Sequence, residues 1–152
     1  MQDRQQTIIV AGAGLGGLTL ALCLAHAGFA VTVLEQAKVL GEVGAGVQIS
    51  ANGSRVLYHL GLAAALNAVG FTPERGEMRH WRTGETLSSR PLGKASEETF
   101  GFPYFHLHRA DFHAVLADAL EAVMPGAIRL NTKVEGFEQT NGGVTVRARG
   151  GE

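Results

Sequence analysis

Short apolar runs flank a helical stretch at the start of the chain. Thr7–Ala11 and Ala30–Leu34 are apolar and rich in β-branched residues, which is typical of parallel strands buried on both faces. Between them, residues 15–27 are rich in leucine and alanine and stop at Gly28, which favours a helix of about three turns with a glycine cap. This order predicts a strand–helix–strand unit over residues 1–36, with a right-handed crossover.

The middle of the chain predicts short elements around a glycine-rich connection at residues 41–49. That connection has too many glycines for a helix and ends in a strand-like triplet, so we interpret it as a loop that approaches a ligand. Ser50 and Asn52 are residue types that cap the N-terminus of a helix. The predicted elements are a helix over residues 50–60, a short helix over 62–69, a hairpin of 77–82 with 86–90, and a strand over 104–107.

The last third of the chain returns to helix and strand. Apolar residues recur at helical spacing over residues 111–120, and Pro125 with Gly126 ends that helix after Met124. A short apolar segment at residues 128–130 then predicts a third parallel strand. The chain closes with a predicted hairpin of residues 133–139 and 144–149. The whole pattern is that of an α/β protein.

Composition and charge narrow the choice of partners. The chain has 152 residues, of which 45% are hydrophobic, enough for one globular domain. Its net charge of -1, without any run of lysine or arginine, predicts neither a nucleic-acid partner nor a membrane-surface partner. Glycines interrupt the apolar stretch over residues 7–34, which argues against a membrane-spanning helix, and the charges of Asp3 and Arg4 cancel, which argues against a secretory signal. The single cysteine, Cys23, fits a reducing cytoplasm.

A glycine-rich turn joins the first strand to the first helix. Its sequence, Gly12-Ala13-Gly14-Leu15-Gly16-Gly17, has the G-x-G-x-x-G pattern of dinucleotide-binding turns. Gly12 allows a tight turn, Gly14 lets a pyrophosphate approach the backbone, and Gly17 lets the helix pack closely. The start of the helix offers free N–H groups and the positive end of its dipole to the phosphates.

Glu35 closes the second strand, about twenty residues beyond the turn. A carboxylate there can accept hydrogen bonds from both hydroxyls of a ribose and repels a 2′-phosphate, which disfavours NADP at this turn. The turn and Glu35 alone fit NAD or FAD equally well. A glycine-rich turn that binds nothing is the structural alternative.

Longer blocks of sequence narrow this general pattern to one family. They are residues 9–17, Leu34-Glu35-Gln36, residues 41–53 and His108-Arg109-Ala110-Asp111-Phe112. Together they resemble the FAD-dependent aromatic hydroxylases (class A flavoprotein monooxygenases), in particular the salicylate and 3-hydroxybenzoate hydroxylase branch. The resemblance implies a Rossmann-like FAD/NAD(P)-binding fold of the glutathione-reductase type, with an additional β-hairpin region. Residues 1–152 would be the N-terminal part of a single FAD-binding domain that is incomplete at the C-terminus, with the substrate-side sheet starting at 76–107.

The resemblance also implies which residues hold FAD. Gly12, Gly14 and Gly17 would hold the pyrophosphate, and Glu35 the adenosine ribose. The remaining cofactor-binding residues would be Leu15, Gly16 and Gln36, with Gly46 and Val47 beside the isoalloxazine ring and Arg109 near the ribityl phosphate. For Arg109, a surface ion pair with Asp111 or Glu35 is the alternative.

The activity implied is hydroxylation of a small aromatic substrate such as a phenolic acid. NADH or NADPH would reduce the flavin, which then forms a C4a-hydroperoxide that attacks the electron-rich ring. Another FAD or NAD oxidoreductase of the same fold group and a non-catalytic dinucleotide-binding module are the alternatives. The sequence identifies no catalytic residue. His106, His108 and His113 have no accompanying carboxylate pattern, so we expect no metal site.

Members of this family run to roughly two or three times this length, as two-part folds usually do. We therefore expect a fragment that is inactive alone and lacks the family's later Asp-Gly and Gly-Asp motifs. The strand that would pair beside Thr7–Ala11 is then absent, which predicts an exposed apolar edge and association into a homo-oligomer.

Overall fold

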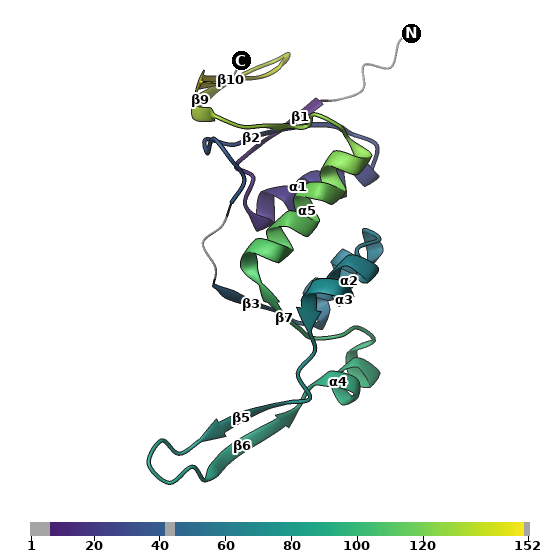
Figure 1. Cartoon of the computed structure of the whole chain (residues 1–152). Coiled ribbons are helices and arrows are strands. Elements are labelled where there is room, and N and C mark those ends of the chain that lie inside the picture. Colours follow the sequence, from purple (N-terminus) through teal and green to yellow (C-terminus); the bar gives the residue numbers. More distant parts are fainter. Residues whose placement is uncertain (1–6, 42–44, 151–152) are drawn as a thin grey trace. The chain divides into compact units, whose positions relative to one another are not determined.

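The structure is a computed structural model that describes residues 7–41 and 45–150, and its elements are drawn in Figure 1. The chain divides into two compact units. Unit 1 comprises Met1–Glu42 and His113–Glu152, and unit 2 comprises Val43–Phe112. The single domain predicted over residues 1–152 stays a prediction.

Unit 1 contains the predicted strand–helix–strand motif. Strand β1 (Thr7–Ala11) leads into helix α1 (Leu15–His26), and strand β2 (Ala30–Leu34) returns parallel to β1. Strand β8 (Ile128–Arg129) pairs parallel with the other side of β2, so the strand order is β1-β2-β8. The third parallel strand predicted from the sequence is therefore confirmed. The carboxyl ends of β1 and β2 lie at the same edge of this sheet.

Burial differs between the two long strands. In β2, Val31 and Val33 on one face and Leu34 on the other are buried. In β1, Val10 is buried on one face, but Ile9 on the other face is 42% exposed. Strand β1 has β2 as its one neighbour among the described residues. The prediction of burial on both faces holds for β2 and is wrong for β1, whereas β1 is an edge strand among the described residues, as predicted.

Helix α1 ends in a glycine cap, as predicted. Gly28 has a φ of 87°, in the left-handed region that glycine adopts without strain. Its N–H donates to the Ala25 carbonyl and the Phe29 N–H donates to the Leu24 carbonyl, both at 3.0 Å. These two bonds form a Schellman motif, which satisfies carbonyls that would otherwise lack a partner.

The rest of unit 1 follows the sequence prediction with small shifts. Helix α5 (Arg109–Val123) begins slightly earlier than predicted and buries Leu116 and Leu120 completely. In Figure 1, α1 and α5 are drawn on the same side of strands β1 and β2. Strands β9 (Thr132–Thr140) and β10 (Gly143–Gly150) form the predicted antiparallel hairpin.

Unit 2 is built on a small antiparallel sheet with strand order β3-β7-β4. In chain order its elements are β3 (Gly46–Ile49), α2 (Ala51–His59), α3 (Ala63–Val69), β4 (Gly70–Phe71), β5 (Arg75–Arg79), β6 (Thr86–Pro91), α4 (Gly93–Phe100) and β7 (Phe105–His108). Strands β5 and β6 pair as the predicted hairpin. Helix α4 was not predicted, because its sequence GKASEETF contains too few apolar residues for a helical period to be recognised.

The start of α2 differs in detail from its prediction. Ser50 occupies the N-cap position, but its side chain caps no backbone group. Its hydroxyl instead donates to Oδ1 of Asn52 at 2.5 Å. The prediction that these two side chains cap the helix is therefore wrong, because they satisfy each other.

Candidate functional site

Two glycines shape the turn between β1 and α1. Gly12 has a φ of 100°, which only glycine adopts readily. A Cβ atom at Gly17 would lie 2.0 Å from the carbonyl oxygen of Gly12, so any side chain there would push the turn away from the helix. The structure thus confirms the conformational reasons for a glycine at both positions.

The other glycines leave open space above the start of α1. A Cβ atom at Gly14 or Gly16 would meet nothing within 4 Å. Gly14 is the N-cap residue, no side chain caps the helix, and its first turn carries no acidic residue. The N–H groups of Leu15, Gly16 and Gly17 precede the first i to i−4 bond, which the Leu18 N–H makes to the Gly14 carbonyl at 2.9 Å. An anion over this turn would meet N–H donors and the positive end of the helix dipole.

Glu35 is fixed at the end of β2 by two backbone contacts. Its Oε2 accepts a hydrogen bond from the Ala13 N–H at 2.7 Å, and its Oε1 accepts one from the Ala37 N–H at 2.8 Å. These N–H donors lower the pKa of the Glu35 carboxyl, and partial burial opposes them. The carboxylate therefore stays ionised at neutral pH, as a ribose-binding acceptor requires, and keeps lone pairs free for further donors.

His113, on α5, contacts the same turn from another side. Its Nε2 lies 2.7 Å from the carbonyl oxygen of Ala13, and its side chain is buried. Because a carbonyl oxygen only accepts, Nε2 must carry the hydrogen in this contact. No local sequence pattern indicates this contact, because Ala13 and His113 are far apart along the chain, and from the sequence His113 was considered only as a metal ligand.

A cavity of about 210 Å³ in unit 1 opens beside Glu35. It lies at the carboxyl ends of β1 and β2, where open α/β sheets bind their ligands. Its lining residues are Ala11, Gly12, Leu34, Glu35, Gln36, Thr132, Lys133 and Val134. Lys133 adds a positive charge that the sequence analysis did not consider. The sequence feature that could have identified Lys133 is its position just after the third parallel strand, at the ligand-binding edge of the sheet.

The remaining candidates lie in unit 2. Gly46 pairs with His108 across strands β3 and β7, and Val47 pairs with Leu107. The N–H of Arg109 donates to the carbonyl of Ala45 at 3.0 Å, so the start of α5 lies against the start of β3. The structure therefore brings Gly46, Val47 and Arg109 together. Gly44, in the same glycine-rich block, is outside the described residues.

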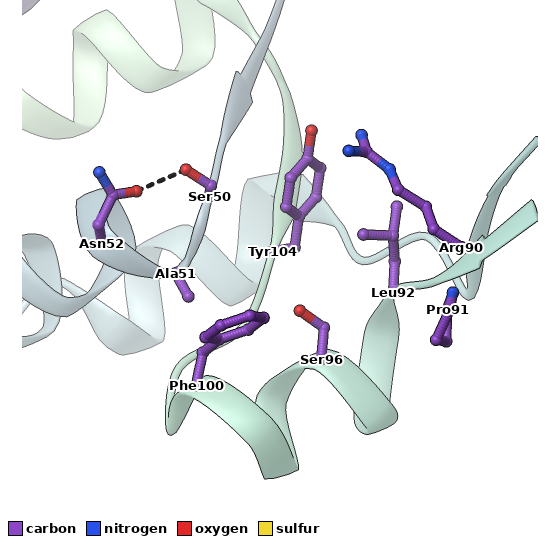
Figure 2. A pocket seen from close by; sticks show the side chains of 9 residues that line it. All are labelled: Ser50, Ala51, Asn52, Arg90, Pro91, Leu92, Ser96, Phe100 and Tyr104. Atoms are coloured by element: carbon purple, nitrogen blue, oxygen red, sulfur yellow. Dashed lines mark hydrogen bonds between the residues drawn. The ribbon is translucent and has the colours of Figure 1, made fainter.

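Unit 2 also contains a cavity of about 500 Å³, shown in Figure 2. Its lining residues are Ser50, Ala51, Asn52, Arg90, Pro91, Leu92, Ser96, Phe100 and Tyr104. Arg90 is the one charged residue among them, and Phe100 and Tyr104 contribute aromatic rings. The Tyr104 hydroxyl donates to Oε1 of Gln48 on β3 at 2.6 Å, so this wall is tied to the strand that carries Gly46 and Val47.

Within residues 7–41 and 45–150, no three His, Cys, Asp or Glu side chains converge in a way that could hold a metal ion. Within the same residues, every helix is too short or too polar to cross a membrane.

The chain matches a family model described as FAD binding domain over residues 5–152. It is 39% identical over 147 residues to 3-amino-4-hydroxybenzoate 2-monooxygenase of Streptomyces platensis, covering 97% of this chain and 36% of that protein. It is 41% identical over 128 residues to 6-hydroxynicotinate 3-monooxygenase of Pseudomonas fluorescens, covering 84% and 33%. Among solved structures, Klebsiella pneumoniae HpxO with FAD and uric acid matches with a TM-score of 0.80 at 26% identity, covering 100% and 38%.

These comparisons confirm the predicted fold class, a Rossmann-like FAD/NAD(P)-binding fold of which the chain contains a part. The chain spans about a third of the length of the curated relatives that it matches. The match to the family model covers nearly all of the sequence, including the glycine-rich turn, Glu35 and Arg109. The chain belongs to the FAD binding domain family.

Proposed function

We propose that this chain is the FAD-binding part of an NAD(P)H-dependent monooxygenase that hydroxylates a small aromatic substrate, such as a phenolic acid. Two of its relatives are a 3-amino-4-hydroxybenzoate 2-monooxygenase and a 6-hydroxynicotinate 3-monooxygenase, which supports this class of reaction. The observation that carries the proposal is the combination of an open, uncapped start of α1 with an ionised carboxylate at the end of β2.

The residues of unit 1 fit the adenosine and pyrophosphate half of FAD. The open space at Gly14 lets a phosphate approach the backbone, and the N–H groups of Leu15, Gly16 and Gly17 face no competing side-chain acceptor at the helix start. Glu35 would accept hydrogen bonds from the ribose, with Gln36 beside it in the same cavity. Gly12 and Gly17 would keep the turn and the helix in place.

In unit 2, Gly46 and Val47 would lie beside the isoalloxazine ring, with Arg109 near the ribityl phosphate. Bound FAD supplies the redox chemistry with oxygen, and the protein supplies orientation and exclusion of water. The part that this chain plays in the reaction is therefore to bind and orient the cofactor.

The cavity of unit 2 is our candidate for part of the substrate site. Its walls are largely apolar, as expected for a small-molecule pocket, and Phe100 and Tyr104 offer ring contacts. The guanidinium of Arg90 would attract an anionic group such as a carboxylate (Figure 2). Its connection to β3 through Gln48 supports a location near the proposed flavin contacts.

We further propose that NADH or NADPH is the transient reductant, that the protein is cytoplasmic, and that the exposed edge of β1 favours a homo-oligomer. The lone cysteine and the near-neutral charge support the cytoplasmic location.

The test begins with a spectrum of the protein purified from cells and titrated with FAD. Flavin absorbance that stays with the protein, together with quenching of flavin fluorescence, is the expected result. Oxidation of NADH and of NADPH is then measured with 3-amino-4-hydroxybenzoate, 6-hydroxynicotinate and 3-hydroxybenzoate, on the whole monooxygenase of which this chain is proposed to be the FAD-binding part. Formation of a hydroxylated product is the expected result. NADH oxidation that yields only hydrogen peroxide would contradict the proposed hydroxylase activity.

A non-catalytic dinucleotide-binding module is the second candidate. It is favoured by the turn and Glu35 alone, which do not distinguish FAD from NAD. Tight NAD binding without any retained flavin would support this candidate and contradict the monooxygenase.

A further inference from the structure

Ala13, at the centre of the glycine-rich turn, is held on both of its backbone polar groups by side chains. Its N–H donates to Oε2 of Glu35 at 2.7 Å, and its carbonyl oxygen lies 2.7 Å from Nε2 of His113. Ala13 is 1% exposed and His113 is 5% exposed, so the contact between them is shielded from water, whereas the contact with Glu35 is partly buried. Two side chains from different elements, β2 and α5, thus fix one residue of the turn.

The planar trans peptide converts these contacts into directions for the neighbouring groups. In a trans peptide the C=O and the N–H point to opposite sides. Because His113 binds the Ala13 carbonyl, the N–H of Gly14 points away from His113. The open space beside Gly14 is where the proposed pyrophosphate would accept that hydrogen.

The preceding peptide is fixed in the same way by Glu35. With the Ala13 N–H directed to Glu35, the Gly12 carbonyl points to the opposite side. That is where Gly17 lies, since a Cβ atom there would be 2.0 Å from the Gly12 oxygen. The two side chains therefore set both peptide planes between Gly12 and Gly14.

Such control is needed because the residues on both sides of Ala13 are glycines. Glycine adopts positive and negative φ with similar ease, so the Ala13–Gly14 peptide can rotate at low cost. A rotated peptide would turn its carbonyl oxygen toward the phosphates and repel them. His113 removes this alternative.

His113 also departs from the pattern of its own helix. It lies between Phe112 and Leu116, both buried, and a polar ring buried there is costly unless it is hydrogen-bonded. The Ala13 carbonyl is the partner that the structure gives to its Nε2. A role for this nitrogen explains a histidine where the helix otherwise buries apolar side chains.

We propose that His113 is a positioning residue for the cofactor: it fixes the Ala13–Gly14 peptide so that the Gly14 N–H faces the pyrophosphate. This inference rests on the proposed function, because it assumes that the turn binds FAD. His113 acts through the backbone and does not itself contact the ligand.

Three variants test this role. His113→Met fills the space without an N–H donor, and His113→Gln restores a donor close to the position of Nε2. Leu120→Ala creates a cavity two turns further along α5, at a fully buried position, and is the control for lost stability alone. FAD affinity is measured by fluorescence quenching and folding by thermal denaturation.

We expect H113M to raise the Kd for FAD by about tenfold, as the loss of a hydrogen bond near a charged ligand would. H113Q should stay within about threefold of the wild type, and L120A should lower the melting temperature while leaving the Kd unchanged. An H113M variant with wild-type affinity would overturn the inference. So would equal weakening in H113M and L120A, because the effect would then follow stability alone.

Two NMR signals separate positioning from stability. The ¹⁵N shift of Gly14 in the ligand-free chain and the ³¹P shifts of bound FAD should change in H113M and return in H113Q. An unchanged Gly14 shift in a folded H113M chain contradicts the positioning role while leaving the proposed function intact. A wild-type protein that binds no FAD overturns the proposed function itself.

Discussion

Glu35 accepts hydrogen bonds from two backbone N–H groups, so its charge is coupled to the shape of the glycine-rich turn. The same contacts lower the pKa of its carboxyl below the usual value of 4.5. A group whose pKa is lower in the folded state stabilises that state fully at pH values above its unfolded pKa. This stabilisation is lost as the pH falls through the lower, folded value.

Replacing Glu35 by glutamine should therefore lower the free energy of unfolding at neutral pH and make that free energy depend less on pH in the acidic range. We expect Glu35→Gln to lower the free energy of unfolding by about 1 kcal/mol at neutral pH, because charged acceptors make the stronger hydrogen bonds. Urea unfolding at a series of pH values measures this difference. Below pH 4.5 the gap between wild type and variant should narrow. The control is Glu85→Gln, an exposed residue, and an equal loss in both variants would contradict the prediction.

Gly16 and Gly17 are adjacent glycines that differ in the space available for a side chain. A Cβ atom at Gly17 would meet the Gly12 carbonyl, whereas one at Gly16 would meet nothing within 4 Å. We expect Gly17→Ala to cost about 1–3 kcal/mol of stability through overpacking, and to weaken FAD binding as the turn shifts. Gly16→Ala should stabilise α1 by up to about 1 kcal/mol, since alanine favours helix. Chemical denaturation measures both, and equal effects would show that the close contact at Gly17 is unimportant.

At the scale of elements, a buried serine connects α2 to the segment before β7. The Ser54 hydroxyl donates to the Pro103 carbonyl at 2.6 Å, and the residue is fully buried. This contact holds the helix that follows β3, where Gly46 and Val47 lie. The start of α2 itself depends less on side chains, because Ser50 caps no backbone group.

Ser54→Ala should therefore destabilise unit 2 by about 1–3 kcal/mol, because it leaves a buried carbonyl without its donor. Ser50→Ala, which removes an exposed hydroxyl that caps no backbone group, should change stability by less than about 0.5 kcal/mol. Hydrogen exchange of the α2 amides, compared between the two variants, locates the effect. Similar exchange in both would contradict the role of Ser54.

At the scale of the whole molecule, the exposed edge of β1 is the feature with the clearest consequence. Its partner among the described residues is β2 alone, and Ile9 is 42% exposed. An exposed strand edge with apolar side chains is a template for pairing with another chain. We expect Ile9→Lys to reduce concentration-dependent association, measured by sedimentation velocity. Val39→Lys, at a residue that is 72% exposed outside any strand, is the control, and an equal reduction there would implicate net charge instead of the edge.

The sequence by itself determined the order of most elements and the character of the turn. Apolar runs predict strands and helices, and glycines predict the turns between them, because both kinds of local conformation depend on residues that are close in the sequence. The predicted positions of β1, α1, β2 and the closing hairpin were therefore correct within a residue or two. Helix α4 was missed because its sequence, GKASEETF, contains too few apolar residues for a period to be recognised.

The tertiary structure decided which distant residues meet. His113 and Ala13 are a hundred residues apart, and Lys133 reaches the cavity beside Glu35 only because β9 starts at the edge of the parallel sheet. No local pattern encodes such contacts, since they depend on how helices and strands pack in three dimensions. The sequence thus determined that a dinucleotide-binding turn forms, and the packing of α5 against that turn decided which way its peptide groups point.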